Sequence, residues 1–346
     1  MTETPAPQIA QTPIRDRLLW PALGAVCLAA LALAAGPDWS SLPARIVLFL
    51  AGVALTAQLL KGRGKQFFNG PMAYIAAASL VLLVILALFA SEISPQNPYD
   101  LRQLDIMDGR LPPGATNFDG TFTYHLGTDE QGRDILSGIL YGLRVSLSVA
   151  IVATLVAMAI GVVVGIYAAW AGGRIESILM RLVDLQLSFP SILVALMLMA
   201  AFGRGLDKVV IALIIVQWAY YARTVRGTAL SETRKEYIDA ARGLGLPVRK
   251  IIFRHLLPNC IPPLLVISTV QIANTIVLES SLSFLGVGVP VTQPSLGLLI
   301  ANGYDYMLSG QYWMSMYPGV ALLAIVASIN LVGDRLRDTL NPRLRK

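Results

Sequence analysis

Long apolar runs, separated by short polar segments, follow one another along most of the chain. A run of about 20 apolar residues is what an α-helix needs to cross a bilayer, because each residue adds about 1.5 Å along the helix axis. The pattern therefore predicts an all-α polytopic membrane protein. Eight spans are predicted, at residues 18–35, 46–60, 72–90, 145–171, 178–202, 209–222, 261–285 and 318–332.

The beginning of the chain divides into two parts. Residues 1–14 are rich in Pro, Thr and Gln, and we expect a disordered tail there because they have little to bury. Residues 15–71 hold the first two predicted spans. The run at 18–35 is long for a signal peptide and no small-residue cleavage site separates it from the next run, so we interpret it as a span.

The composition supports a membrane protein and argues against nucleic acid as a partner. The 346 residues are 55% hydrophobic and only 14% charged, whereas a soluble domain has about a quarter charged residues. The net charge of +6 is spread over loops and the C-terminal tail without interleaved aromatic residues. Cys27 and Cys260 lie in or beside spans, where we expect small buried side chains and neither a disulfide framework nor a metal site.

The distribution of basic residues predicts the orientation of the chain. Basic residues gather before the first span, at Lys61–Lys65, at Arg223–Arg254 and in the C-terminal tail. Positively charged loops stay in the cytoplasm, and eight spans bring all four of these segments to that side together with both termini. Residues 91–144 contain eight acids and four basic residues, which suits the outer face.

Three features inside the spans have more than one interpretation. Gly161 and Gly165 have the spacing for close helix contact, or they coincide by chance in a Gly-rich chain. Arg181 and Asp184 can pair on one helix face, either as a gate or ATPase contact or, as we prefer, as an ion pair near the headgroups. Pro190 removes a backbone donor and predicts a kink in the fifth span.

Acids and turn residues provide further candidates. Glu279 lies at membrane level, where it could line a substrate path, pair with another subunit or reach water at a helix break; these alternatives stay open. His125, Asp129 and Asp134 match no metal-ligand spacing, so we interpret them as capping and turn residues. Residues 286–294 contain glycines and prolines without charge and predict a rigid outer loop or a re-entrant element.

The segment Arg223–Pro258 is the most informative of the polar segments. It holds eight basic residues against three acids, and it includes the sequence IDAARGLG. This sequence predicts one short helix with small residues for close approach, stopped at Gly245 in a left-handed conformation, after which Pro247 cannot continue the helix. From these residues alone, a docking helix and an ordinary amphipathic interfacial helix are equally good interpretations.

Five motifs, in order, resemble one known family. They are HLGTDEQGRDILSGILYGLRVSL (125–147), MRLVDLQLSFPSIL (180–193), KEYIDAARGLG to RKIIFRHLLPN (235–259), ESSLSFLGVGVPVTQPSLGLLIANG (279–303) and NLVGDRLRDTLNPRLR (330–345). The chain resembles the C-type permease subunits of dipeptide, oligopeptide and nickel ABC importers over residues 72–346. It departs from their pattern at Gly138, where arginine is common, at Asp239, where glutamate is usual, and at His255, where isoleucine is common.

The resemblance implies a fold, a function and partners. The fold is a six-span ABC type I importer permease core, here with two extra N-terminal spans of unassigned role. The function is import of di- or oligopeptides, with nickel or another small solute as the alternative, across a bacterial inner membrane. The implied partners are a second permease, two cytosolic ATPases and an external solute-binding protein.

The resemblance also assigns residues. Segment 223–258 becomes a cytoplasmic coupling loop that docks on an ATPase through Glu236, Asp239, Ala240, Ala241, Arg242 and Gly245. Glu279 and Pro190 become candidates for the translocation path or gate. No catalytic residue, cofactor or metal is expected, because the chain has no G-x-x-x-x-G-K-[ST] loop for ATP and hydrolysis would occur in the partner subunits.

Two rival classes fit the residues less well. A secondary transporter would be expected to contain inverted repeats and coupling groups on discontinuous helices, and the sequence has no convincing internal repeat. A membrane enzyme would need a grouping such as H-E-x-x-H or Ser/His/Asp, and only two histidines are present.

Overall fold

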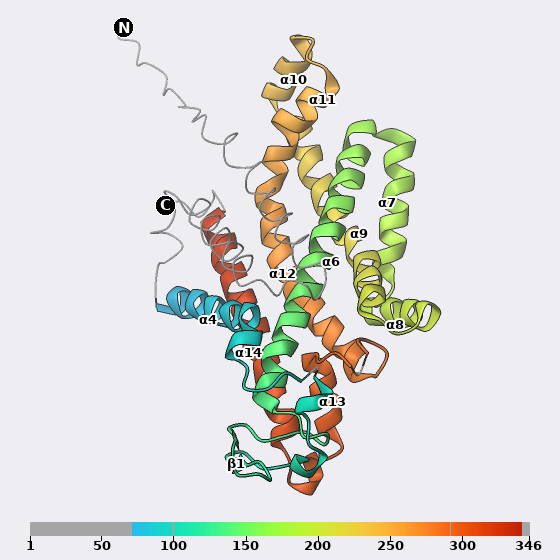
Figure 1. The fold of residues 1–346 in the computed structure, drawn as a ribbon. Coiled ribbons are helices and arrows are strands. Elements are labelled where there is room, and N and C mark those ends of the chain that lie inside the picture. The colour runs from blue at the N-terminus through green and yellow to red at the C-terminus, as the bar shows by residue number, and fades with distance from the viewer. Residues whose placement is uncertain (1–70, 99, 291, 341–346) are drawn as a thin grey trace, which may run out of the picture.

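Residues 71–98, 100–290 and 292–340 are described by a computed structural model (Figure 1). Several sequence predictions concern residues outside these ranges. They are the two N-terminal spans, the basic segment Lys61–Lys65, Cys27 and the end of the basic tail. Within the described ranges, five helices are long and apolar enough to cross a membrane, and a sharply bent helix pair makes a sixth candidate. The predicted six-span core is thus confirmed, with its fifth span broken in two.

The long helices and the bent pair form a bundle. The long helices are α4 (Pro71–Leu88), α6 (Ile135–Ala171), α9 (Leu206–Thr233), α12 (Leu257–Phe284) and α14 (Trp313–Leu340), and the bent pair is α7 (Gly173–Ser188) and α8 (Ser191–Phe202). Shorter helices are α5 (Ala90–Ile93), α10 (Glu236–Gly243), α11 (Val248–Ile251) and α13 (Leu296–Tyr304). A π-helical turn, Ile252–Leu256, joins α11 to α12.

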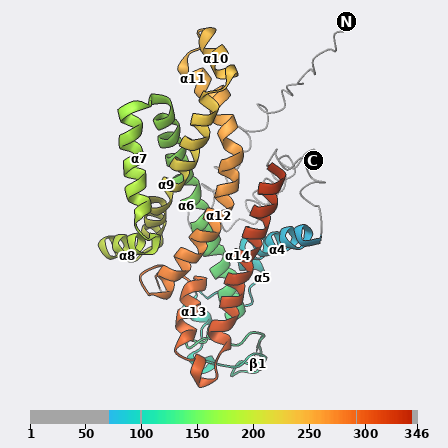
Figure 2. The same cartoon turned by 180° about the vertical axis from the view of Figure 1, so that it is seen from behind.

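The bundle has two distinct ends (Figure 1). Helices α10 and α11 form one end, which we call the loop end. The opposite end, the cap end, carries residues 94–98 and 100–134, which contain a small hairpin of β1 (Ala115–Thr116) and β2 (Thr123–Tyr124) with Thr116 opposite Thr123. The view from behind (Figure 2) shows the same separation, with α13 and the hairpin both at the cap end. The basic loop and the acid-rich segment therefore lie at opposite ends of the molecule.

Helix α6 starts ten residues earlier than the fourth span was predicted to start, at Ile135 and not at Val145. Asp134 caps it: one carboxylate oxygen accepts from the Ser137 backbone N–H at 2.8 Å. Such a cap satisfies a donor that the first turn of a helix leaves free. The prediction was wrong because Arg144 interrupts the apolar run, although the backbone continues as helix through it.

Gly161 and Gly165 lie where α6 crosses α9, the most extensively packed helix pair in the described chain. A Cβ atom added at Gly161 would lie 2.4 Å from the Tyr221 Cβ and 2.7 Å from the Trp218 carbonyl oxygen. One added at Gly165 would lie 2.6 Å from the Ala222 carbonyl oxygen. Of the two interpretations of this spacing, close helix contact is confirmed.

The predicted fifth span is two helices and not one kinked helix. Helices α7 and α8 meet at an angle of 90°, and Pro190 stands at the break with extended backbone, φ −58° and ψ 125°. Proline cannot donate the hydrogen bond that would continue the helix, so the chain turns sharply at this point. The structure also pairs Asp184 with Arg223 of α9, which replaces the predicted pair with Arg181.

Other predicted spans were too short. Helix α9 runs to Thr233, so the first eleven residues of the predicted loop are helical. Helix α14 extends beyond the predicted span 318–332 at both ends. Helix α13 follows the glycine- and proline-containing segment 286–294 and was not predicted; Leu296 and Leu299 are buried there among residues of α6 and α14. Hydropathy missed these features because it detects the lipid-facing middle of a helix better than its polar ends or a short buried helix.

The structure also explains one departure from the family pattern. Gly138 is buried in α6, and a Cβ added there would lie 3.3 Å from the Leu299 side chain of α13. An arginine at position 138 would have to displace α13. The absence of a side chain at Gly138 therefore allows α13 to pack closely against α6.

Candidate functional site

Helix α10 is held at the loop end by apolar contacts on one face. Ile238 and Ala241 are buried and pack with Ile251 of α11, and Trp170 from the end of α6 lies against this cluster. A helix with one apolar face gains stability by covering that face and leaves the opposite face to solvent or to a partner. The eight residues of α10 are thus positioned by contacts with α6 and α11.

The opposite face of α10 is exposed and combines a small residue with charges. Glu236, Asp239, Ala240 and Arg242 are all exposed. The Arg242 guanidinium lies 5.1 Å from the centre of the Trp170 ring, and its Nη1 lies 3.5 Å from Asp239 Oδ1. The acids stand in the first turn and Arg242 in the last, which is the favourable arrangement for the helix dipole.

The two neighbouring alanines were predicted to act together, but they face in different directions. Ala240 is exposed, whereas only 4% of Ala241 is exposed, within the cluster under the helix. Residues adjacent in a helix point about 100° apart, so an eight-residue helix cannot present both to one surface. Ala240 is available for close contact with a partner, and Ala241 fixes α10 to its own chain.

The end of α10 has the geometry predicted for it. Gly245 has φ +69°. Its N–H donates to the Arg242 carbonyl at 2.9 Å, and the Leu246 N–H donates to the Ala241 carbonyl at 3.2 Å. This pair of bonds is the Schellman motif, which stops a helix by placing a left-handed residue after it. The predicted stop at Gly245 is confirmed.

Replacement of Gly245 by alanine should loosen α10 without a steric clash. A Cβ at Gly245 meets nothing within 4 Å, so the cost is the left-handed backbone alone, about 1–2 kcal/mol. We expect roughly tenfold faster hydrogen exchange of the α10 amides in Gly245→Ala. The matched control is Gly243→Ala, because Gly243 also has open space but is the last residue of α10 and does not need a left-handed backbone. Equal exchange in the two variants would contradict the role of the Schellman stop.

Helix α9 carries the chain into this site and is tied to α7 by two ion pairs. Arg226 Nε donates to Glu176 Oε1 at 2.8 Å, and Arg223 pairs with Asp184. Both arginines lie in the part of α9 that leads to the loop end. These pairs were not foreseen, since acid and base are about forty to fifty residues apart along the chain and only the α7–α9 packing brings them together.

Glu279 lies far along α12 from α10 and is completely buried. Its carboxylate accepts from Ser146 of α6 and from Ser283, each at 2.8 Å, and from Ser280 at 3.5 Å. Hydroxyl donors compensate an acid that has left water. Pro190 is exposed at the α7–α8 break, whereas Glu279 is buried between α6 and α12 and hydrogen-bonds to serines there.

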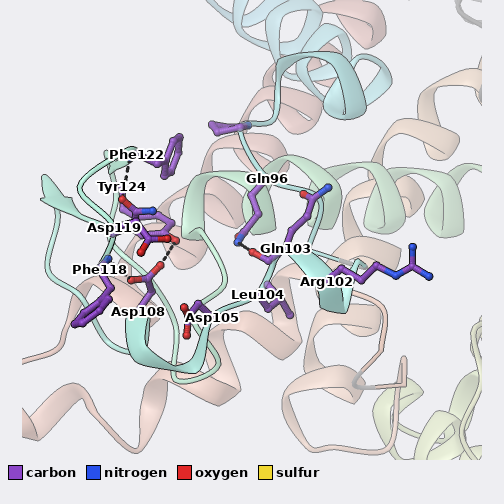
Figure 3. Close-up of a pocket in the computed structure, with 12 residues that line it drawn as sticks. Gln96, Arg102, Gln103, Leu104, Asp105, Asp108, Phe118, Asp119, Phe122 and Tyr124 are labelled. Carbon is purple, nitrogen blue, oxygen red and sulfur yellow. Dashed lines mark hydrogen bonds between the residues drawn. The ribbon is translucent and has the colours of Figure 1, made fainter.

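The cap end contains a hollow of about 380 Å³ (Figure 3). Asp108 organises its wall: Tyr124 donates its hydroxyl to Asp108 Oδ2 at 2.8 Å, and the Phe118 N–H donates to Oδ1 at 2.8 Å. Burial, and then the hydrogen bond to Asp108, raises the pKa of the Tyr124 hydroxyl. The hollow is thus lined by groups that mainly hold the cap together.

The acids near His125 have the capping and turn roles that were predicted for them. Asp129 Oδ1 accepts from the backbone N–H groups of Gln131 and Arg133 at 2.8 and 2.9 Å, and Asp134 caps α6. Burial raises the pKa of the Asp129 carboxyl. Within the described residues, no group of three or more His, Cys, Asp or Glu side chains is arranged to hold a metal ion.

The architecture and the exposed loop-end helix define a class of protein, a multi-span permease subunit of an ABC importer, and comparisons with known proteins identify the family. Residues 161–346 match the family described as binding-protein-dependent transport system inner membrane component. The chain belongs to this family.

Several named proteins are similar to most of the chain. A Brucella suis protein named as a peptide transport system permease is 38% identical over 271 residues, covering 78% of this chain and 88% of that protein. The di/tripeptide permease DppC of Pseudomonas aeruginosa is 35% identical, covering 77% of this chain and 86% of its own length. The dipeptide permease DppC of Escherichia coli is 35% identical, covering 79% and 90%.

A solved structure has the same fold. A chain of the MetNI methionine ABC transporter in an inward-facing form is 21% identical and aligns with a TM-score of 0.50, covering 60% of this chain and 98% of its own. At this identity the likeness concerns the fold alone. It supports the type I importer architecture predicted from the sequence.

Proposed function

We propose that this chain imports di- or oligopeptides as one of two permease subunits in an ATP-driven importer. Three relatives with peptide permease names, each aligned over more than three quarters of this chain, support the substrate class. In this proposal a second permease completes the translocation path, two cytosolic ATPases bind at the loop end, and an external solute-binding protein delivers the peptide at the cap end.

The observation that carries the proposal is the exposed face of α10. Glu236, Asp239, Ala240 and Arg242 form a short helical surface at the tip of the molecule, and the Ile238–Ala241–Ile251 cluster holds this surface in place. Such a surface suits insertion into a groove, because Ala240 permits close approach and the charges define register. Closure of the ATPases on ATP would then move α10 as a rigid element, and the spans would rearrange to alternate access.

The orientation in the membrane follows from the same proposal. The loop end with its basic residues faces the cytoplasm, and the acid-rich cap end faces outward. Both termini are then cytoplasmic, with the two N-terminal spans added outside the permease core. The residues of segment 223–258 that belong to the coupling surface are those exposed on α10, with Ala241 and Gly245 fixing its position and its end.

Glu279 and Pro190 remain candidates for the path or gate. Glu279 would act by holding α6 and α12 together through its serine partners, and it would contribute to the path only in a state that opens this contact. Pro190 would act as the fixed corner between α7 and α8, about which the two helices change their angle.

Reconstitution in proteoliposomes tests the proposal. This chain is combined with its second permease, ATPases and solute-binding protein, and uptake of a radiolabelled dipeptide is measured with and without ATP. We expect uptake only with ATP and only with all subunits, and a nickel chelate should not compete. Competition by nickel would favour the alternative substrate class, and uptake driven by an ion gradient without ATP would favour a secondary transporter.

A further inference from the structure

Tyr237 occupies a special position in α10. Its ring lies against the cluster of Ile238, Ala241 and Ile251, whereas its hydroxyl reaches away from α10 to two other elements. The hydroxyl donates to Glu232 Oε2 near the end of α9. It accepts from Asn259 Nδ2, in the first turn of α12, at 2.9 Å. One phenol group thus joins the loop-end helix to both helices that lead from it into the membrane.

The direction of each of these hydrogen bonds is determined by the chemistry of the partners. A carboxylate oxygen only accepts and an amide nitrogen only donates, so the Tyr237 hydroxyl uses its one hydrogen toward Glu232 and a lone pair toward Asn259. The other oxygen of Glu232 is engaged by Lys235 Nζ at 2.5 Å. A hydrogen bond to a charged acceptor is among the stronger ones, and the Glu232 side chain is only 12% exposed.

Asn259 extends the connection into the π-helical turn. Its Nδ2 donates a second hydrogen bond, to the His255 carbonyl at 2.6 Å, and His255 lies within the π-helical turn Ile252–Leu256. A π-turn interrupts regular helical bonding and often marks a functional site. Pro262 and Pro263 follow in α12 and remove two more backbone donors. The start of α12 is therefore the part of this span best able to change shape.

We propose that Tyr237 is a positioning residue that transmits movement of α10 through Asn259 to the π-helical turn that precedes α12. The proposal rests on the proposed function, because it needs an ATPase that moves α10. The docking face and the transmitting group are separate: Ala240 and Asp239 point outward, while the Tyr237 hydroxyl points to α9 and α12. A change at the hydroxyl should therefore leave docking intact and interrupt the response of α12.

The test uses the full complex with its ATPases, as wild type and as Tyr237→Phe, which keeps the ring and removes the hydroxyl. Hydrogen exchange of residues 236–243 and 252–260 is measured without nucleotide and with ATP trapped by vanadate. In wild type we expect trapping to change exchange in both segments, by about tenfold in the π-turn. In Tyr237→Phe we expect normal ATPase co-purification and a normal α10 response, but less than about a twofold response in the π-turn.

Two further variants sharpen the result. Asn259→Leu should reproduce the loss, and the double variant should be no worse than either single one, because both changes break the same connection. Tyr167→Phe, at an exposed tyrosine of α6 near the loop end, is the matched control and should behave as wild type. Peptide uptake per ATP hydrolysed should fall by about tenfold in Tyr237→Phe and Asn259→Leu, which corresponds to about 1.4 kcal/mol.

The outcomes separate the two proposals. If no ATPase binds even the wild-type chain, the proposed function fails. If ATPase binds but the π-turn responds equally in wild type and Tyr237→Phe, or responds in neither, the transmitting role of Tyr237 is overturned and the proposed function stands. Loss of ATPase binding in Tyr237→Phe would also overturn it, because the hydroxyl would then only hold α10 in shape.

Discussion

Ala240→Trp is expected to abolish co-purification of the ATPase subunits while the chain still inserts in the membrane. Ala240 is exposed on α10, and the buried face of the helix consists of other residues. A tryptophan there leaves the fold of the free chain unchanged. Its side chain, however, occupies space that the wall of the partner's groove would need in the complex. We expect at least about a hundredfold loss of affinity, or about 2.7 kcal/mol, as is typical for the centre of an interface.

The control for this prediction is Ala200→Trp, at an exposed alanine of α8, away from the loop end (Figure 1). It introduces the same bulk on another element and should leave ATPase binding unchanged. Size-exclusion profiles in detergent show whether each variant is folded. If Ala240→Trp co-purifies with the ATPases as well as wild type does, the exposed face of α10 is not the docking surface.

The second large effect is expected at the α6–α9 contact. In Gly161→Ala, the new methyl group would lie 2.4 Å from the Tyr221 Cβ and 2.8 Å from the Ala222 backbone nitrogen. Neither atom can move away by a side-chain rotation, so the two helices must separate. We expect a loss of about 1–3 kcal/mol in unfolding free energy. The loss should appear as a lower midpoint of thermal unfolding, followed by the fluorescence of the detergent-solubilised protein.

Gly227→Ala is the matched control, because Gly227 lies in α9 and a Cβ there meets nothing within 4 Å. Alanine at an open helix position is more favourable than glycine by up to about 1 kcal/mol, so this variant should be equally or more stable. The contrast between the same substitution at the two positions isolates the helix contact from helix propensity. Equal midpoints for the two variants would contradict close α6–α9 packing in the native protein.

Much of the architecture could be predicted from local patterns in the amino-acid sequence. Apolar runs located the six core spans, Pro190 located the break in the fifth, and IDAARGLG with Gly245 located α10 and its end. Each of these signals is local. A proline removes its own donor, a glycine adopts its own left-handed conformation, and hydropathy averages over one segment, so no distant contact is needed to interpret them.

The candidate site was less predictable because its residues depend on how the helices are rotated against each other. The sequence placed Ala240 and Ala241 side by side, but only the packing of α10 on Ile251 assigns one to the surface and the other to the interior. Tyr237 hydrogen-bonds to Asn259, which lies 22 positions further along the chain, and no sequence pattern indicates this contact.

By itself, the sequence determined that this is a polytopic membrane protein with a basic, helix-containing loop, because solvation by lipid and water acts on each segment separately. The tertiary structure alone decided that Asp184 pairs with Arg223, that serines of α6 and α12 surround Glu279, and that α13 is buried at the cap end. Apart from the α12 serines, which are neighbours of Glu279 along the same helix, these contacts join residues far apart in the chain. They follow from the rotation and register of packed helices, which close packing sets for the whole bundle at once.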